Sequence, residues 1–225
     1  SGDRLVIDGV PVTGPGATMP LGAGRLAGLA TLRDEIAPTL ERQLDEIARG
    51  LIAAFREGAN PGLFTWAGGT VPGGATAGVA DTIAVDPAFD PDAGGDPLRL
   101  RDGNAVLYNP TGDAGFSDRL REQLSRLSEP FPFDPAAGLP GTAGVDRFAL
   151  DSIGWLETRR QEASAGADYR ETLLRRANEA LSNARGVNMD DEYAFQMQLE
   201  RSFAASSKLM GIVDDLFRTL FRDLG

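Results

Sequence analysis

The sequence lacks the residues that most enzyme and metal sites depend on. It contains no cysteine and no histidine, and its one lysine is Lys208. Without cysteine there are no disulfides, thiol nucleophiles or thiolate metal ligands. Without histidine the commonest general base and metal ligand is missing. A serine nucleophile would have only Lys208 as a base, and we find no group of residues arranged for catalysis. We therefore expect a protein that is not an enzyme and has no cofactor.

Long hydrophobic runs and positive charge are also scarce. No apolar stretch approaches the roughly 20 residues that span a bilayer, and the first residues show no signal-peptide pattern. The net charge is −11 and the isoelectric point is about 4.5. Nucleic-acid phosphates and anionic membrane surfaces both attract basic proteins, so neither is an expected partner. Hydrophobic residues make up 42% of the 225 residues, which is enough for real cores.

Periodicity predicts a mainly α fold with minor β structure. Residues 4–12 form a predicted hairpin that turns at Asp8-Gly9. A long amphipathic helix is expected over 31–57, with Pro38 as a kink or first-turn residue. Further helices are expected from Ser117 to about Leu127, with an apolar face on that helix, and over 146–184. Small residues around Gly166 suggest tight helix neighbours there.

Glycine and proline gather between these helices. Residues 59–115 and 129–146 are loop-rich, with short helical or strand pieces expected at 77–83 and 98–100. We therefore expect long helices in a rod-like bundle, a small β-hairpin and Gly/Pro-rich loops. The expected divisions are a rod-domain part over 1–145, a long return helix over 146–185, and a C-terminal amphipathic assembly helix over 186–225.

The C-terminal 40 residues are the most informative part of the chain. After Gly186-Val187-Asn188 comes an acidic run, Asp190-Asp191-Glu192, which suits a helix N-terminus. Apolar residues then recur at helical spacing in what looks like a narrow coiled-coil seam. An ordinary amphipathic helix packed on its own domain has the same periodicity. The residues expected to bind partners are Met189, Tyr193, Met197, Phe203, Leu209, Val213, Leu216 and Leu220.

These residues resemble the C-terminal signature of flagellar axial proteins. That signature is close to GVNLDEE, followed by a Gln-rich stretch, an AYQASAK-like block and a helix ending in D-x-L-x-x-T-L-L. Here Met189 replaces the usual leucine, and Ala204 replaces the glutamine of the block formed by residues 202–208. The resemblance implies an assembly role for this helix.

Two further stretches are similar to one family among the axial proteins. Residues 24–36 resemble the GxLxGLLxxRD segment of the hook-associated protein 1 (FlgK) family, the hook–filament junction subunits. Residues 83–103 are similar to the corresponding part of its alphaproteobacterial members. That family pairs an N-terminal helix with the C-terminal one. Since no such helix precedes residue 24 here, we expect the chain to be a fragment lacking the N-terminal part, with its seam after about Ser206 frayed or in contact with another chain.

The resemblance implies a structural subunit that joins hook to filament and is required for flagellum assembly. It implies export by the flagellar type III apparatus to an extracellular position. The implied partners are the hook protein, the second hook–filament junction protein, copies of the chain itself and a flagellar export chaperone. Another axial protein, such as a rod, hook or second junction subunit, is the nearest alternative.

Three other patterns are weaker pointers to chemistry. The Gly22–Gly28 loop lacks the spacing of a dinucleotide-binding turn. Glu157, Glu162 and Glu171 lie beside arginines and are expected to form surface ion pairs. An acidic loop with Asp86, Asp90, Asp92 and Asp96 suggests an extracellular calcium-binding module, but Arg101 stands where an EF-hand from Asp90 needs an acid. We expect these aspartates to hydrogen-bond their own turns and to bind no metal.

Overall fold

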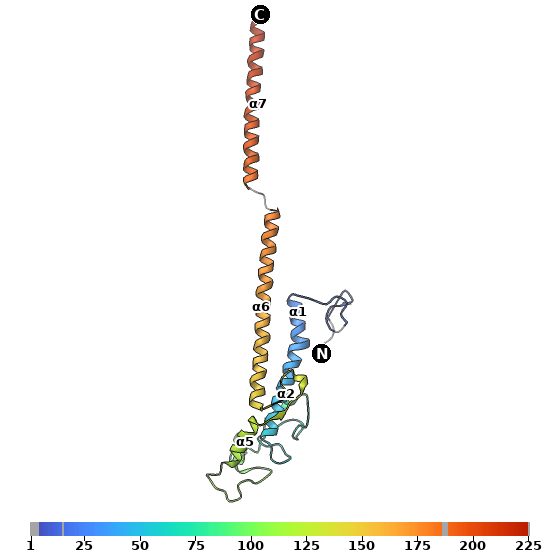
Figure 1. Ribbon diagram of the computed structural model, residues 1–225, viewed down its shortest axis with the longest axis vertical. Coiled ribbons are helices and arrows are strands. Elements are labelled where there is room, and N and C mark those ends of the chain that lie inside the picture. Colours follow the sequence, from blue (N-terminus) through green and yellow to red (C-terminus); the bar gives the residue numbers. More distant parts are fainter. Residues whose placement is uncertain (1–4, 15, 186–188, 225) are drawn as a thin grey trace. The chain divides into compact units, whose positions relative to one another are not determined.

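The computed structural model describes residues 5–14, 16–185 and 189–224, and these residues form a mainly α protein with three two-stranded antiparallel sheets (Figure 1). The predicted fold class, mainly α with minor β, is confirmed. By packing, the chain divides into two units, Ser1–Gln161 and Glu162–Gly225. The boundary falls within the long helix α6, Val145–Arg185.

The N-terminal hairpin forms where the sequence predicts it. Strand β1 (Val6–Ile7) pairs with β2 (Val10–Pro11), with Val6 opposite Pro11. The turn residues Asp8 and Gly9 have φ values of 49° and 81°. Positive φ at both central residues is the geometry of a type I′ turn, whose twist matches that of the strands.

The long helix expected over 31–57 is longer at its start and changes geometry in the middle. Helix α1 (Arg25–Thr31) continues through a π-helical segment, η1 (Leu32–Ile36), into α2 (Ala37–Ala54). Pro38 lies in the first turn of α2, as predicted, directly after the π-helical segment. Because the helix is continuous there, the missing N–H of Pro38 removes one hydrogen bond from the helix interior. The helix ends at Ala54 with Phe55 as its C-cap, slightly before the predicted end, and Gly58 follows with φ 60°.

The predicted apolar stripe of this helix forms only part of its inner face, where Ile47 and Leu51 pack against the core. Leu32 and Leu44 are about half exposed, whereas Gln43, Glu46 and Arg49 are buried. Backbone groups of the loop after residue 129 lie against α2 and need hydrogen-bond partners, which leucines cannot supply. Polar side chains of α2 therefore turn inward beside the apolar ones, and only the exposure of Leu32 and Leu44 departs from the amphipathic prediction.

Arg49 and Glu46 form the centre of this buried polar face. The Nε of Arg49 donates to Glu46 Oε1 at 3.0 Å, and its Nη2 also donates to the Pro132 carbonyl. The guanidinium lies 4.5 Å from the centre of the Phe131 ring. Glu46 in turn accepts the N–H of Asp134 at 2.8 Å. The ion pair thus holds the loop against α2.

Gln43 links α2 to α6 across the same unit. Its Nε2 donates to the Ala137 carbonyl at 3.0 Å, and its Oε1 accepts from Ser152 Oγ at 2.8 Å. Seven residues further along α2, a Cβ at Gly50 would come within 2.8 Å of Val145. Glycine at position 50 therefore leaves room for the Val145 side chain of α6 against α2.

Two small apolar clusters complete the core of this unit. In the first, Phe133 stacks on Phe148 with ring centroids 3.9 Å apart, beside Ala137 and Val145. The second consists of Ala48, Ile52 and Val79, with Trp66 packed against it. Both clusters lie against α2, which therefore organises this unit.

The loop-rich middle carries short elements only. Strand β3 (Phe64–Thr65) pairs with β4 (Ala84–Val85), and β5 (Phe131–Pro132) pairs with β6 (Thr142–Ala143). The remaining short helices are α3 (Val79–Thr82), η2 (Pro91–Ala93), α4 (Arg99–Asp102), α5 (Asp118–Ser128) and η3 (Pro135–Ala137). The buried carboxylate of Glu57 accepts hydrogen bonds from the N–H groups of residues 104–106 at 2.6–3.1 Å, which fixes one of the loops.

Helix α5 begins after Ser117, as predicted, but that side chain makes no capping hydrogen bond. The expected apolar face holds only in part, since Leu120 and Leu127 are partly buried and Leu127 packs against the core. Leu124 is exposed, and Arg119 and Gln123 are buried instead. Arg119 donates to the Arg56 carbonyl at 2.7 Å and lies over the Tyr108 ring. This helix is held by its arginine, which satisfies a carbonyl just beyond the end of α2.

The second unit contains the end of α6 and helix α7, Met189–Leu224. Its described side chains are exposed, apart from partly covered positions at Gly166 and Thr172. A Cβ at Gly166 would meet nothing within 4 Å. The tight neighbours expected there are therefore absent among the described residues. Helix α7 runs unbroken to Leu224, so its distal part is helical in the structure.

Candidate assembly surface

Helix α7 presents large apolar side chains to solvent along its described length. Of the residues expected to bind partners, Tyr193, Met197, Phe203, Leu209, Val213 and Leu216 are all exposed, and Phe203 is 76% exposed. The side chains of Met189 and Leu220 lie outside the described residues. Burying such side chains in a contact releases about 25 cal/mol per Å² of apolar area, so the surface is suited to assembly.

These residues do not lie on one seam. Since an α-helix turns about 100° per residue, Tyr193 and Met197 lie about 160° and 120° round the helix from Leu209. One continuous helix from Met189 to Leu224 leaves no break that could realign them. The early residues and the later ones therefore occupy different faces of α7.

The sequence analysis missed several large apolar residues of α7, and two of them, Phe195 and Leu199, continue the later face toward the N-terminus. Phe195 lies about 40° from Leu209 round the helix, and the missed residues are all exposed. A helical projection over the whole segment, rather than steps from one apolar residue to the next, would have found them. They are Phe195, Leu199, Met210, Ile212 and Phe217.

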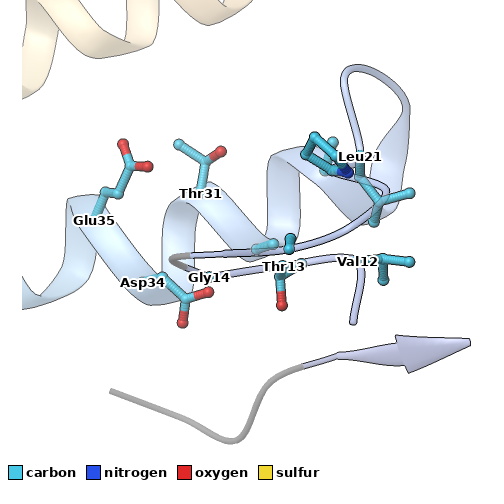
Figure 2. A pocket seen from close by; sticks show the side chains of 11 residues that line it. Val12, Thr13, Gly14, Leu21, Thr31, Asp34 and Glu35 are labelled. Atoms are coloured by element: carbon cyan, nitrogen blue, oxygen red, sulfur yellow. The ribbon is translucent and has the colours of Figure 1, made fainter. Parts of the chain in front are cut away.

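A hollow beside the N-terminal hairpin is the depression of the first unit considered as a small-molecule site (Figure 2). It measures about 450 Å³ and lies between the loop over 12–21 and helices α1 and η1. Its polar lining comes from Thr13, Thr31, Asp34 and Glu35. The Thr13 hydroxyl accepts the N–H of Leu5 at 2.9 Å. Thr13 is therefore already used in holding the hairpin.

The two carboxylates of this hollow do not form an acid–base pair. Figure 2 shows Asp34 and Glu35 extending in different directions. Asp34 accepts two hydrogen bonds from Arg33, at 2.7 and 2.9 Å. These bonds hold the pKa of Asp34 below its usual value, so the group stays ionised near neutral pH. A carboxylate of this kind is a poor general acid or base at that pH.

The aspartates of the acidic loop stabilise turns. Asp86, Asp90 and Asp96 each accept a hydrogen bond from the N–H two residues further on, at 2.9, 3.0 and 2.9 Å. This is the Asx-turn arrangement expected from the sequence. Among the described residues, no group of three or more acidic side chains is arranged to hold a metal ion.

Glu157 of α6 forms a surface ion pair with an arginine, as the sequence analysis expects. Glu157 accepts two hydrogen bonds from Arg160 at 2.8 and 2.6 Å, which lower its pKa to about 2, and Gln161 adds a third. Arg160 is mostly exposed. In the parts of the chain described here, no helix is both long and apolar enough to cross a membrane.

A match to a known protein family falls on the same part of the chain as this surface. Residues 181–222 match the family model described as flagellar basal body rod FlgEFG protein C-terminal. The match covers the end of α6 and nearly all of α7. It supports a flagellar axial protein with a structural role in the flagellum. A search of curated proteins found no match, and a search of solved structures found none either.

Proposed function

We propose that this chain is a structural subunit of the hook–filament junction and that α7 is its assembly helix. The observation that carries the proposal is that the segment matching the flagellar family is also the segment with the most exposed apolar surface. Isolated helices gain most of their stability from packing. Helix α7 therefore gains stability when partner helices cover it in the flagellum.

The partners in this proposal are the hook protein, the second junction protein, copies of the chain and an export chaperone. The subunit is exported through the flagellar type III apparatus and works outside the cell. Its function is mechanical, since it adapts two tubes of different stiffness. It performs no catalysis, and a chain without histidine or cysteine is consistent with that.

A rod or hook subunit is the second candidate, because the matching model is described by rod proteins. The residues resembling the junction family, 24–36, lie outside the matched range. A strain lacking the gene separates the two functions. Loss of a junction subunit leaves cells with hooks and no filaments, whereas loss of a rod subunit leaves cells without hooks, and electron microscopy distinguishes them.

The variant Leu216→Asp tests the role of α7. Leu216 is 64% exposed, so the isolated chain should fold normally. In an assembled contact the aspartate would be buried without a partner, which costs several kcal/mol. We expect filament attachment or chaperone binding to be lost. The control is Asp215→Leu, which changes the neighbouring position on the charged side of the helix. Normal motility and chaperone affinity in Leu216→Asp would contradict the assembly role.

A further inference from the structure

The sequence contains two Asp-Gly bonds, Asp8-Gly9 and Asp102-Gly103, and no Asn-Gly bond. Of all aspartyl bonds, this dipeptide is the one whose carboxyl group reacts most readily with its own backbone, because glycine places no side chain beside the attacking nitrogen. The two bonds have the same chemistry but lie in opposite surroundings. The fold therefore decides which of them reacts.

Asp8-Gly9 lies in an open turn at the tip of the hairpin. Both residues are exposed, and Asp8 is the one non-glycine among the described residues with a positive φ, 49°. A Cβ at Gly9 would meet nothing within 4 Å. In a two-residue turn the ladder bonds join the flanking residues, here Ile7 and Val10, so the central N–H is left out. Among the described residues we find no hydrogen bond to the Asp8 carboxylate or from the Gly9 N–H.

Asp102-Gly103 is held at both reacting groups. The Asp102 carboxylate accepts from Nε and Nη2 of Arg101 at 2.6 and 2.7 Å, and from Nδ2 of Asn109 at 2.6 Å. These hydrogen bonds, first those of Arg101 and then that of Asn109, lower the pKa of Asp102 to about 2. The carboxyl therefore stays ionised, and a carboxylate is a poor electrophile. The N–H of Gly103 is also occupied, since it donates to the Arg99 carbonyl at 2.7 Å.

We propose that Asp8 is a site of spontaneous backbone modification, at which aspartate converts to isoaspartate, and that the fold protects Asp102 from the same reaction. The Gly9 nitrogen attacks Cγ of the protonated Asp8 side chain, a C–N bond forms, and the hydroxyl leaves with the proton of the nitrogen as water. The cyclic succinimide then takes up water. Opening at the former side-chain carbonyl restores aspartate, whereas opening at the main-chain carbonyl gives isoaspartate. The net change gains and loses no atoms and needs no oxidant, reductant or enzyme, and it is independent of the proposed function.

The modification changes the end of the hairpin that nothing else holds. Isoaspartate lengthens the main chain by one methylene group, because the chain then runs through Cβ and Cγ. Turn length fixes the register of a hairpin, so the pairing of Ile7 with Val10 is disturbed. The base of the hairpin is held separately, since the Val12 N–H donates to the Leu5 carbonyl and the Thr13 hydroxyl accepts the Leu5 N–H, both at 2.9 Å. The tip therefore opens while the base stays closed.

Incubation of the purified full-length chain at neutral pH tests the proposal. Peptide mass spectrometry locates isoaspartate, and an isoaspartate-specific methyltransferase with a labelled methyl donor measures it. We expect Asp8 to convert at least about tenfold faster than Asp102, which must first lose hydrogen bonds to a charged group. In urea both sites lose their folded surroundings, so the two rates should become similar. Equal rates in the folded chain, no isoaspartate at Asp8, or a ratio that urea leaves unchanged would overturn the proposal.

Two variants separate the sites. Asp8→Glu keeps the charge, but its longer side chain must close a larger and less favourable ring, so the isoaspartate signal from the hairpin should disappear. A signal that persists there would show that Asp8 is not the reacting residue. Arg101→Ala removes the main hydrogen-bond donor of Asp102 and should raise its conversion severalfold, with Asp8 unchanged. An unchanged rate at Asp102 in this variant would contradict protection by the fold.

Discussion

The first unit and helix α7 use apolar residues in opposite ways. In the first unit Phe148 is fully buried against Phe133, and polar side chains of α2 hold the surrounding loops. In α7 the described apolar side chains are exposed. The first unit therefore has an apolar core of its own, whereas the described apolar side chains of α7 are exposed and available for the contacts proposed for this helix.

The two tryptophans make this difference measurable. Trp66 and Trp155 both belong to the first unit, and the sequence has no others. Tryptophan fluorescence therefore reports the unfolding of the first unit, whereas circular dichroism reports the helices of both units. The predictions below use this separation, beginning with the largest expected effect.

Matched phenylalanine truncations should separate the two parts most strongly. Phe148→Ala leaves a cavity beside Phe133 and should destabilise the first unit by about 3–5 kcal/mol. Phe203→Ala removes the same atoms from a side chain that is 76% exposed, and should change that unit by less than about 0.5 kcal/mol. Urea unfolding followed by tryptophan fluorescence measures both. Similar shifts in the two variants would show that α7 contributes to the stability of the first unit.

Ion pairs give a second matched comparison. Glu46→Gln leaves Arg49 buried without its carboxylate, and should destabilise the first unit by about 3 kcal/mol. Arg160→Ala removes the exposed partner of Glu157 and should cost less than about 1 kcal/mol. The double variant Glu46→Leu with Arg49→Met removes the unpaired charge but leaves the Asp134 N–H and the Pro132 carbonyl without their side-chain partners. It should therefore be no more stable than Glu46→Gln. A double variant more stable than Glu46→Gln would contradict the role of these side chains in holding the loop.

Acid sensitivity should show the smallest difference. Hydrogen bonds from Arg101, and then from Asn109, lower the pKa of Asp102 to about 2 from 3.8. A group with a lowered pKa in the folded state stabilises the protein above its unfolded pKa, and this contribution is lost as the pH falls toward its folded pKa. Asp102→Asn should therefore flatten the fall in melting temperature between about pH 4 and pH 2.

The control for this prediction comes from the other unit. Asp168→Asn changes an exposed carboxylate of α6 after the boundary at Gln161. Melting followed by tryptophan fluorescence should keep the wild-type dependence on pH in this variant. The same flattening in both variants would mean that net charge, rather than the Asp102 hydrogen bonds, sets the acid sensitivity.

Local sequence was enough to predict the helices and the hairpin. Asp8-Gly9 predicted the turn because both residues tolerate positive φ. The helical spacing over 146–184 and after Asn188 predicted α6 and α7, and the acidic run at 190–192 predicted where the last helix begins. These features depend on neighbouring residues along the chain, so they can be read from it.

The inner face of each helix depended on tertiary structure. Periodicity predicted an apolar side for this helix, but it could not show that loop carbonyls and an N–H group would lie against Gln43, Glu46 and Arg49. Arg49 donates to the Pro132 carbonyl, which lies 83 residues away in the sequence. A local sequence pattern cannot predict a contact over such a separation. Buried backbone groups must be paired, and only the path of the loops decides which side chains pair with them.

Helix α7 shows the opposite balance. The sequence by itself determined that it is a helix with many apolar residues, and the family match lies on the same residues. Only the unbroken helical backbone decided that Tyr193 and Leu209 occupy different faces, because a single interruption would have rotated one set relative to the other. The angle between two side chains on a helix accumulates over every residue between them, so it is fixed by the continuity of the structure.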